Sequence, residues 1–202
     1  MPTFPYRRFY DAIAWLYGPA MRAIPIWSAY TRRALSYLPT EGNILEIGHG
    51  PGLLLEELAN RYALVAGLDL SSGMIQQAKR RLQRANLPVC LAQGDAVAIP
   101  YRTDCFDAVV TTFAFSAVPD ANSTMREMAR VLRPGGVLAL VDAGFPSNGN
   151  VMGTLLARTW ALFGDFMRDE AELMRHAGLR VIERQEFGAF DGMRLVVGKK
   201  PP

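Results

Sequence analysis

Cysteine and histidine are scarce in this chain, which has 202 residues and two of each. Cys90 and Cys105 do not have the spacing of metal ligands, and each lies in or next to an expected strand. We therefore expect no metal site and two reduced, buried thiols, which suits a cytoplasmic protein.

Long apolar runs are also missing. The best stretch, 151–167, is interrupted by Arg158 and Asp165, so no segment is expected to span a membrane. The N-terminus has no signal-peptide pattern, because Arg7 and Arg8 are followed by aromatic residues and an acid instead of an apolar run.

The composition is that of a folded globular protein. Half of the residues are hydrophobic and 20% are charged, and the length fits one domain with a small appendage. The net charge is only +3, but residues 1–40 contain five arginines and a single acid. A solvated helix face is the plain explanation of this basic segment, and contact with anionic lipid is the alternative.

Helix and strand patterns alternate along most of the chain. Residues 6–38 have helical spacing of aromatic and aliphatic residues, and we expect a helical cap over 1–40 and the main domain over 41–202. Strands are expected at 43–47, 63–70, 88–95, 106–113, 137–143, 180–187 and 192–200, and helices at 53–61, 71–85, 120–132, 150–166 and 168–177. This order predicts an α/β fold with a doubly wound, mostly parallel seven-stranded sheet. The last two strands are too close in sequence for a crossover helix and are expected to form an antiparallel hairpin.

A glycine loop follows the first strand in the segment ILEIGHGPG, with Gly48, Gly50 and Gly52. The third glycine comes one residue too early for a dinucleotide-binding loop, and no lysine follows it as in a phosphate loop. The carboxylate of Glu46 would repel a pyrophosphate but would suit a cationic ligand.

Four motifs in order resemble the class I S-adenosylmethionine-dependent methyltransferases. E-x-G-x-G-x-G resembles their first motif, and AGLDLSSGMIQQAKRRL, QGDAVAIPYRTDCFDAVVTTFAF and REMARVLRPGGVLALVD are similar to the segments that follow it. The resemblance implies a Rossmann-like fold, with S-adenosylmethionine as cofactor and S-adenosylhomocysteine as product. It covers about 44–142, half of the chain.

The resemblance also implies roles for individual residues. The glycines would let the backbone approach the amino-acid part of the cofactor, which Glu46 would orient. Asp69 would accept both ribose hydroxyls, and Leu70 would pack on the adenine. Asp95 would accept from the adenine amino group, with the backbone of Ala96 beside the ring. The carbonyls of Thr112 and Phe113 would face the cofactor's ammonium.

The segment after the fourth strand excludes several classes of methyl acceptor. It lacks the Asp/Asn-Pro-Pro-aromatic run of DNA amino-methylating enzymes, the paired glutamates of arginine methyltransferases and the acids of polyamine enzymes, so no nucleic-acid partner is expected. The segment is apolar instead, and we expect Phe115, Tyr10 and Trp160 in the acceptor pocket. Residues 6–38 combine arginines with aromatic residues, seven of which lie within 6–30, namely Tyr6, Phe9, Tyr10, Trp15, Tyr17, Trp27 and Tyr30. This mixture favours an apolar or lipid-like acceptor and peripheral contact with the inner face of the membrane.

The overall pattern resembles the methyltransferase type 11 group of ubiquinone and menaquinone biosynthesis, which includes bacterial phospholipid N-methyltransferases. We expect N-methylation of a phosphatidylethanolamine-type headgroup, with C-methylation of a quinone precursor or another small molecule as the alternative. A non-catalytic cofactor-binding or membrane-peripheral protein is the alternative of another class. The candidates for a catalytic side chain are His49, Tyr10 and Tyr17, and the sequence indicates no oligomeric state.

Overall fold

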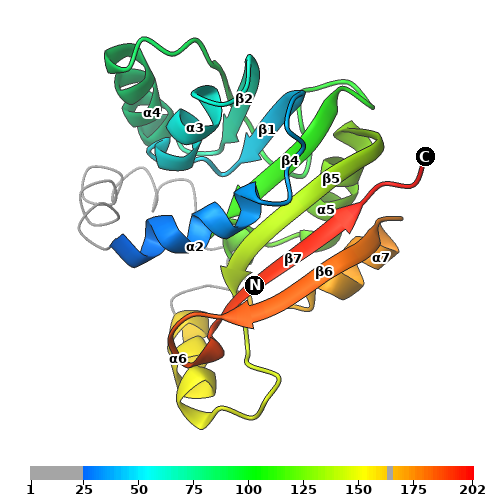
Figure 1. The fold of residues 1–202 in the computed structure, drawn as a ribbon. Coiled ribbons are helices and arrows are strands. Elements are labelled where there is room, and N and C mark those ends of the chain that lie inside the picture. The colour runs from blue at the N-terminus through cyan, green and yellow to red at the C-terminus, as the bar shows by residue number, and fades with distance from the viewer. Residues whose placement is uncertain (1–24, 163–165) are drawn as a thin grey trace.

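The structure is a computed structural model, and it describes residues 25–162 and 166–202. A seven-stranded sheet forms its centre, in the order β3-β2-β1-β4-β5-β7-β6 (Figure 1). The strands are β1 (Asn43–Ile47), β2 (Leu64–Asp69), β3 (Cys90–Gln93), β4 (Phe106–Thr112), β5 (Leu132–Ala143), β6 (Arg180–Phe187) and β7 (Met193–Lys199). β1 to β5 pair in parallel, and β7 runs antiparallel to both β5 and β6. The predicted fold class is confirmed.

Helices cover both faces of the sheet. The helices are α2 (Pro25–Leu35), α3 (Leu53–Ala59), α4 (Ser72–Arg84), α5 (Ala121–Val131), α6 (Val151–Leu162) and α7 (Glu170–His176), with 3-10 turns η1 (Phe115–Ala117) and η2 (Ala189–Asp191). α2, α3 and α4 share one hydrophobic cluster with the sheet, while α5 and α7 share the other. α6 lies apart from these layers, below the sheet in Figure 1 and beside η2.

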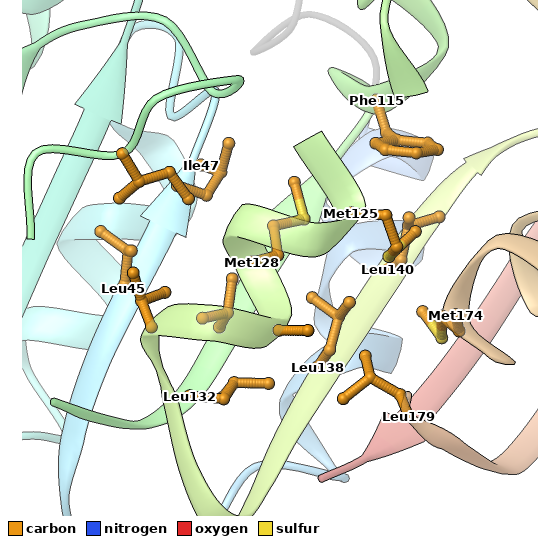
Figure 2. Packing of buried hydrophobic residues seen from close by; sticks show 14 of the residues in the cluster. Leu45, Ile47, Phe115, Met125, Met128, Leu132, Leu138, Leu140, Met174 and Leu179 are labelled. Carbon is orange, nitrogen blue, oxygen red and sulfur yellow. The ribbon is translucent and has the colours of Figure 1, made fainter. Parts of the chain in front are cut away.

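The core under α5 and α7 is built from methionine and leucine side chains (Figure 2). Met125 and Met128 of α5 face Leu138 and Leu140 of β5, and Met174 of α7 closes the cluster. The strands are apolar on both faces because each face is covered by helices. This packing holds β4 and β5 in place and fixes the segment that follows β4.

The described part of the N-terminal segment packs against the domain. Tyr30 of α2 stacks edge-on against Phe187 at 5.2 Å between ring centroids, and the Arg33 guanidinium lies 4.2 Å from the same ring. Arg32 pairs with Glu57 of α3 at 3.1 Å. These two arginines therefore have partners within the domain. The division between cap and domain at residue 40 stays a prediction.

Two details of the sequence interpretation are wrong. The fifth strand begins at Leu132 instead of residue 137, because Gly135 and Gly136 exchange backbone hydrogen bonds with Lys200 and continue the strand through an irregularity. The two cysteines are free as expected, but Cys90 is exposed and Cys105 is only partly buried, since Cys90 begins the edge strand β3 and Cys105 precedes β4. No helix in 25–162 or 166–202 has the length and hydropathy needed to cross a bilayer.

Candidate cofactor and acceptor site

The glycine loop lies between β1 and α3, where β1 and β2 reach their carboxyl ends. Gly48, Gly50 and Gly52 have φ of 69°, 51° and 78°, in the left-handed region that favours glycine. The Gly48 amide donates to the Leu68 carbonyl of β2 at 2.8 Å. The loop is therefore tied to the neighbouring strand.

The three glycines are needed for different reasons. A β-carbon on Gly48 would collide with the Ala114 side chain, and one on Gly52 would lie 2.9 Å from the Ala78 β-carbon of α4. A β-carbon on Gly50 would meet no atom of residues 25–162 or 166–202 within 4 Å. Two of the glycines thus allow close packing, whereas Gly50 borders space that the described residues leave open to a ligand.

Asp69, the last residue of β2, holds the loop through its carboxylate. One oxygen accepts the Gly50 amide at 2.8 Å, and the other accepts the Ser71 amide at 2.9 Å. Ser71 in turn caps α4 by accepting the Met74 amide at 3.2 Å, as the sequence predicted. Each carboxylate oxygen can accept a further hydrogen bond, so this clamp is compatible with binding hydroxyl groups.

Arg81 of α4 donates a hydrogen bond to the glycine loop, and the sequence interpretation missed this contact. Its Nε donates to the Pro51 carbonyl at 3.1 Å, and its Nη1 pairs with Glu56 at 2.8 Å. The RR pair in the helix pattern could not reveal this contact, because the contact depends on how α4 packs against α3.

Glu46 is a buried carboxylate, with an exposed fraction of 2%. Burial and the nearby Asp69 carboxylate raise the pKa of Glu46 well above its usual value. One of its oxygens has no hydrogen-bond partner among the described residues. Two carboxyl groups and an unpaired buried oxygen make this corner of the sheet suitable for a cation.

His49 points inward, with an exposed fraction of 3%. Its Nδ1 donates to the Gly50 carbonyl at 2.8 Å, so the proton lies on Nδ1 in the neutral ring, and the buried Nε2 has no described partner. Burial lowers the pKa of His49, although Asp69 opposes this shift. The ring edge lies 2.8 Å from the position that a β-carbon on Gly67 would take. His49 therefore packs on β2 instead of facing solvent.

The remaining residues that were predicted for the cofactor lie around the same edge. Leu70 is exposed directly after β2. Asp95 follows β3 and accepts the Val97 amide at 3.1 Å, which shapes a turn that includes Ala96. The Gly94 amide donates to the Asp69 carbonyl at 3.0 Å and brings this turn next to β2.

The residues at the end of β4 complete this edge. Thr112 ends the strand, and Phe113 has a φ of 53° while its amide donates to the Val141 carbonyl at 2.8 Å. Phe115 does not form an open pocket wall as expected: its exposed fraction is 1%, and it packs in the core with Met125. The reason is that η1 turns this side chain under α5.

The other predicted acceptor and catalytic residues are not placed here. Tyr10 and Tyr17 lie outside the described residues. Trp160 belongs to α6, whose backbone is described. Within 25–162 and 166–202, no three histidine, cysteine or acidic side chains come together as metal ligands.

Asp142, near the end of β5, is a second buried carboxylate that sequence reasoning missed. Its oxygens accept the amides of Ser116 and Ala143, each at 2.8 Å, and so fix η1. Burial raises the pKa of Asp142 to about 7 in spite of these donors, and Glu170 adds to the shift. Glu170 pairs at 2.8 Å with Arg194 on the strand next to β5. The lone acid in the apolar run VLALVDA was the signal.

The comparisons with known proteins agree with this geometry. Residues 45–140 match the family described as methyltransferase domain. This part of the chain is therefore similar to that family, as the four motifs of the sequence indicate. A demethylmenaquinone methyltransferase of Mycobacterium marinum is 36% identical to this chain over 120 residues, which are 59% of this chain and 49% of that protein. A phosphatidylethanolamine N-methyltransferase of Cereibacter sphaeroides is 39% identical over 103 residues, 50% of each chain. The chain thus spans about half the length of the relatives it matches.

Solved structures share the fold of this chain along nearly its whole length. A putative methyltransferase from Haloferax volcanii, solved with the Trm112 activator, has a TM-score of 0.78 and 24% identity, covering 96% of this chain and 98% of that one. A Thermotoga maritima protein described as a possible histamine N-methyltransferase has a TM-score of 0.76 and 19% identity, covering 96% and 99%. At these identities the likeness concerns the fold.

Proposed function

We propose that the protein is an S-adenosylmethionine-dependent methyltransferase that holds its cofactor at the carboxyl ends of β1, β2 and β3. The observation that carries this proposal is the clamp between Asp69 and the Gly50 amide, beside the open space at Gly50. Ligands of open α/β sheets bind at this edge, next to the point where the strand order reverses.

The chemistry of these residues fits S-adenosylmethionine. The buried Glu46 oxygen without a partner and the nearby Asp69 suit a ligand with a positive charge. Asp69 retains acceptor capacity for ribose hydroxyls, and Leu70 offers an apolar surface to the adenine. Asp95 and Ala96 would contact the far edge of the adenine ring. The loop at Gly48 and Gly52 would contact the amino-acid part of the cofactor. Thr112 and Phe113 would contribute carbonyls.

When bound, the cofactor supplies an electrophilic methyl group on a sulfonium. The contribution of the protein is to orient this group, exclude water and present the acceptor in line. His49 faces β2 with a lowered pKa, so its role in this arrangement is to position the loop. Asp142 acts on the acceptor side by holding η1 through the Ser116 amide.

For the acceptor, we propose a small apolar or amphiphilic molecule, and first the amine headgroup of a phosphatidylethanolamine-type phospholipid. The similarity to the Cereibacter sphaeroides enzyme supports this choice. C-methylation of a quinone precursor is the second candidate, because demethylmenaquinone methyltransferases match a longer segment of the chain. We place the protein in the cytoplasm, with peripheral contact to the membrane through residues 6–38.

Transfer of labelled methyl from S-adenosylmethionine tests the proposal. Phosphatidylethanolamine vesicles, a demethylated menaquinol and simple amines are offered separately, with Asp69→Asn as the inactive control. Label in the phospholipid supports the first candidate, and label in the quinol replaces it with the second. A folded protein that binds the cofactor but labels none of them would favour a non-catalytic role.

A further inference from the structure

The outward face of α6 is unusually apolar. Val151, Met152 and Leu155 lie at helical spacing and have exposed fractions of 81%, 52% and 57%. These three residues, with Phe190 of η2 at 52%, are called the α6 patch below. Soluble domains seldom expose large aliphatic side chains so close together unless the surface has a partner.

The inward face of α6 explains this arrangement, because it is made of small residues. Gly153 and Ala157 are buried, and a β-carbon on Gly153 would collide with the Phe190 carbonyl. The Asn150 side chain caps the helix by accepting the Gly153 amide at 3.1 Å. The helix is thus held close to η2 by its small side, which fixes its larger apolar side outward.

The positive charge of Arg158 indicates which kind of partner the α6 patch would bind. Arg158 lies seven residues after Val151 on the same exposed side, and the helix contains no acidic residue. The carboxylate of Asp191, next to Phe190, accepts a hydrogen bond from the side-chain amide of Asn148 at 2.8 Å. A lipid interface accommodates both parts of this surface, with the aliphatic side chains at the acyl boundary and the cation at the headgroups.

A second copy of the chain fits less well. A symmetric contact through α6 would bring a second Arg158 to the patch and no acid from the facing helix. The phosphates of an anionic bilayer would neutralise Arg158 and accept the aliphatic side chains at the same time.

We propose that the α6 patch docks on an anionic lipid bilayer, with Val151, Met152, Leu155 and Phe190 entering the interface and Arg158 at the level of the headgroup phosphates. Figure 1 shows α6 near the end of β5 from which the chain leaves the sheet, so docking would bring that edge toward the membrane. Such docking requires no methyl transfer, and it is separate from the contact proposed for residues 6–38.

Flotation of the full chain with phosphatidylcholine vesicles, with and without phosphatidylglycerol, tests the proposal. The double variant Val151→Ser/Leu155→Ser should weaken binding to the anionic vesicles about tenfold or more. Arg158→Glu should weaken it and reduce its dependence on salt. Leu64→Ser is the matched control, because Leu64 is an exposed aliphatic residue with a fraction of 63% on β2, and it should bind like the wild type.

Three outcomes would overturn the proposal. The wild type does not float with anionic vesicles, or the double variant floats as well as the wild type. Alternatively, sedimentation shows a dimer of the wild type that the double variant loses, which assigns the patch to a second copy. Calorimetry with S-adenosylhomocysteine on the same variants separates this proposal from the proposed function, because neither serine substitution touches the glycine loop.

Discussion

Substituting Gly50 by alanine separates cofactor binding from stability. The added β-carbon meets no atom of the described residues within 4 Å, so this part of the chain resists it only through the φ of 51°. A left-handed conformation costs an L-residue about 1–2 kcal/mol, and the unfolding free energy should fall by that amount. The same β-carbon would enter the space proposed for the cofactor. An extra methyl group in a packed site costs about 1–3 kcal/mol, which corresponds to an S-adenosylhomocysteine Kd raised about 5- to 150-fold.

Gly135→Ala is the matched control for this substitution. Gly135 has a φ of 78°, and a β-carbon there would also meet no atom within 4 Å in the described part of the chain, but Gly135 lies near the start of β5. Both variants should therefore lose similar stability in urea titrations, and only Gly50→Ala should lose affinity in calorimetry. Equal affinity of Gly50→Ala and the wild type would refute the assignment of the open space at Gly50 to the cofactor.

Three further predictions concern the buried groups. Glu46→Gln should raise the unfolding free energy at alkaline pH by about 1–2 kcal/mol, because it removes a buried charge beside a second carboxylate. It should also weaken S-adenosylhomocysteine binding about tenfold. A lower unfolding free energy at alkaline pH would contradict the burial of this charge. Gly67→Ala should destabilise the fold by about 1–3 kcal/mol, because its β-carbon would contact the His49 ring. His49→Ala should relieve part of that loss in the double variant, whereas additive changes in the unfolding free energy from urea titrations would exclude the contact. The pKa of Asp142 is raised to about 7, so its stabilising contribution is complete below its unfolded pKa of about 4 and is lost as the pH rises through about 7. Asp142→Asn should therefore reduce the fall in unfolding free energy between about pH 4 and pH 7, and an unchanged slope in urea titrations over that range would contradict the burial of this charge.

The order of elements could be predicted because it depends on local patterns. Apolar runs, helical spacing and glycine-containing turns indicated all seven strands, and Ser71 capped its helix as expected. The start of β5 could not be predicted, because residues Gly135 and Gly136 continue the strand only through their pairing with Lys200 at the end of the chain.

The part of the candidate site that follows directly from the strand ends could be expected from the sequence, and its role in cofactor binding stays a prediction. The glycine loop and Asp69 come together because parallel strands bring their carboxyl ends to one edge. Phe115 was misplaced, since an apolar residue after a strand can line a pocket or enter the core, and only the packing of α5 decides which.

Other contacts depend on tertiary structure alone. The inward position of His49 requires Gly67 on a different strand, and the support of the loop requires the packing of α4 against α3. The same limit applies to α6, which was expected as a helix. Its exposed side is set by the close approach of Gly153 to η2.

Calorimetric titration of S-adenosylhomocysteine into the wild type, Asp69→Asn and Asp104→Asn tests the central claim most directly. The Asp69→Asn side chain would keep the shape but lose the charge that holds the Gly50 amide, so the account predicts binding by the wild type and a Kd about 10- to 100-fold weaker for this variant. Asp104 pairs with Lys200 away from the glycine loop, and its asparagine variant should bind like the wild type. Folded wild-type protein that releases no heat and shows no binding, or an Asp69→Asn variant with unchanged affinity, would contradict the account.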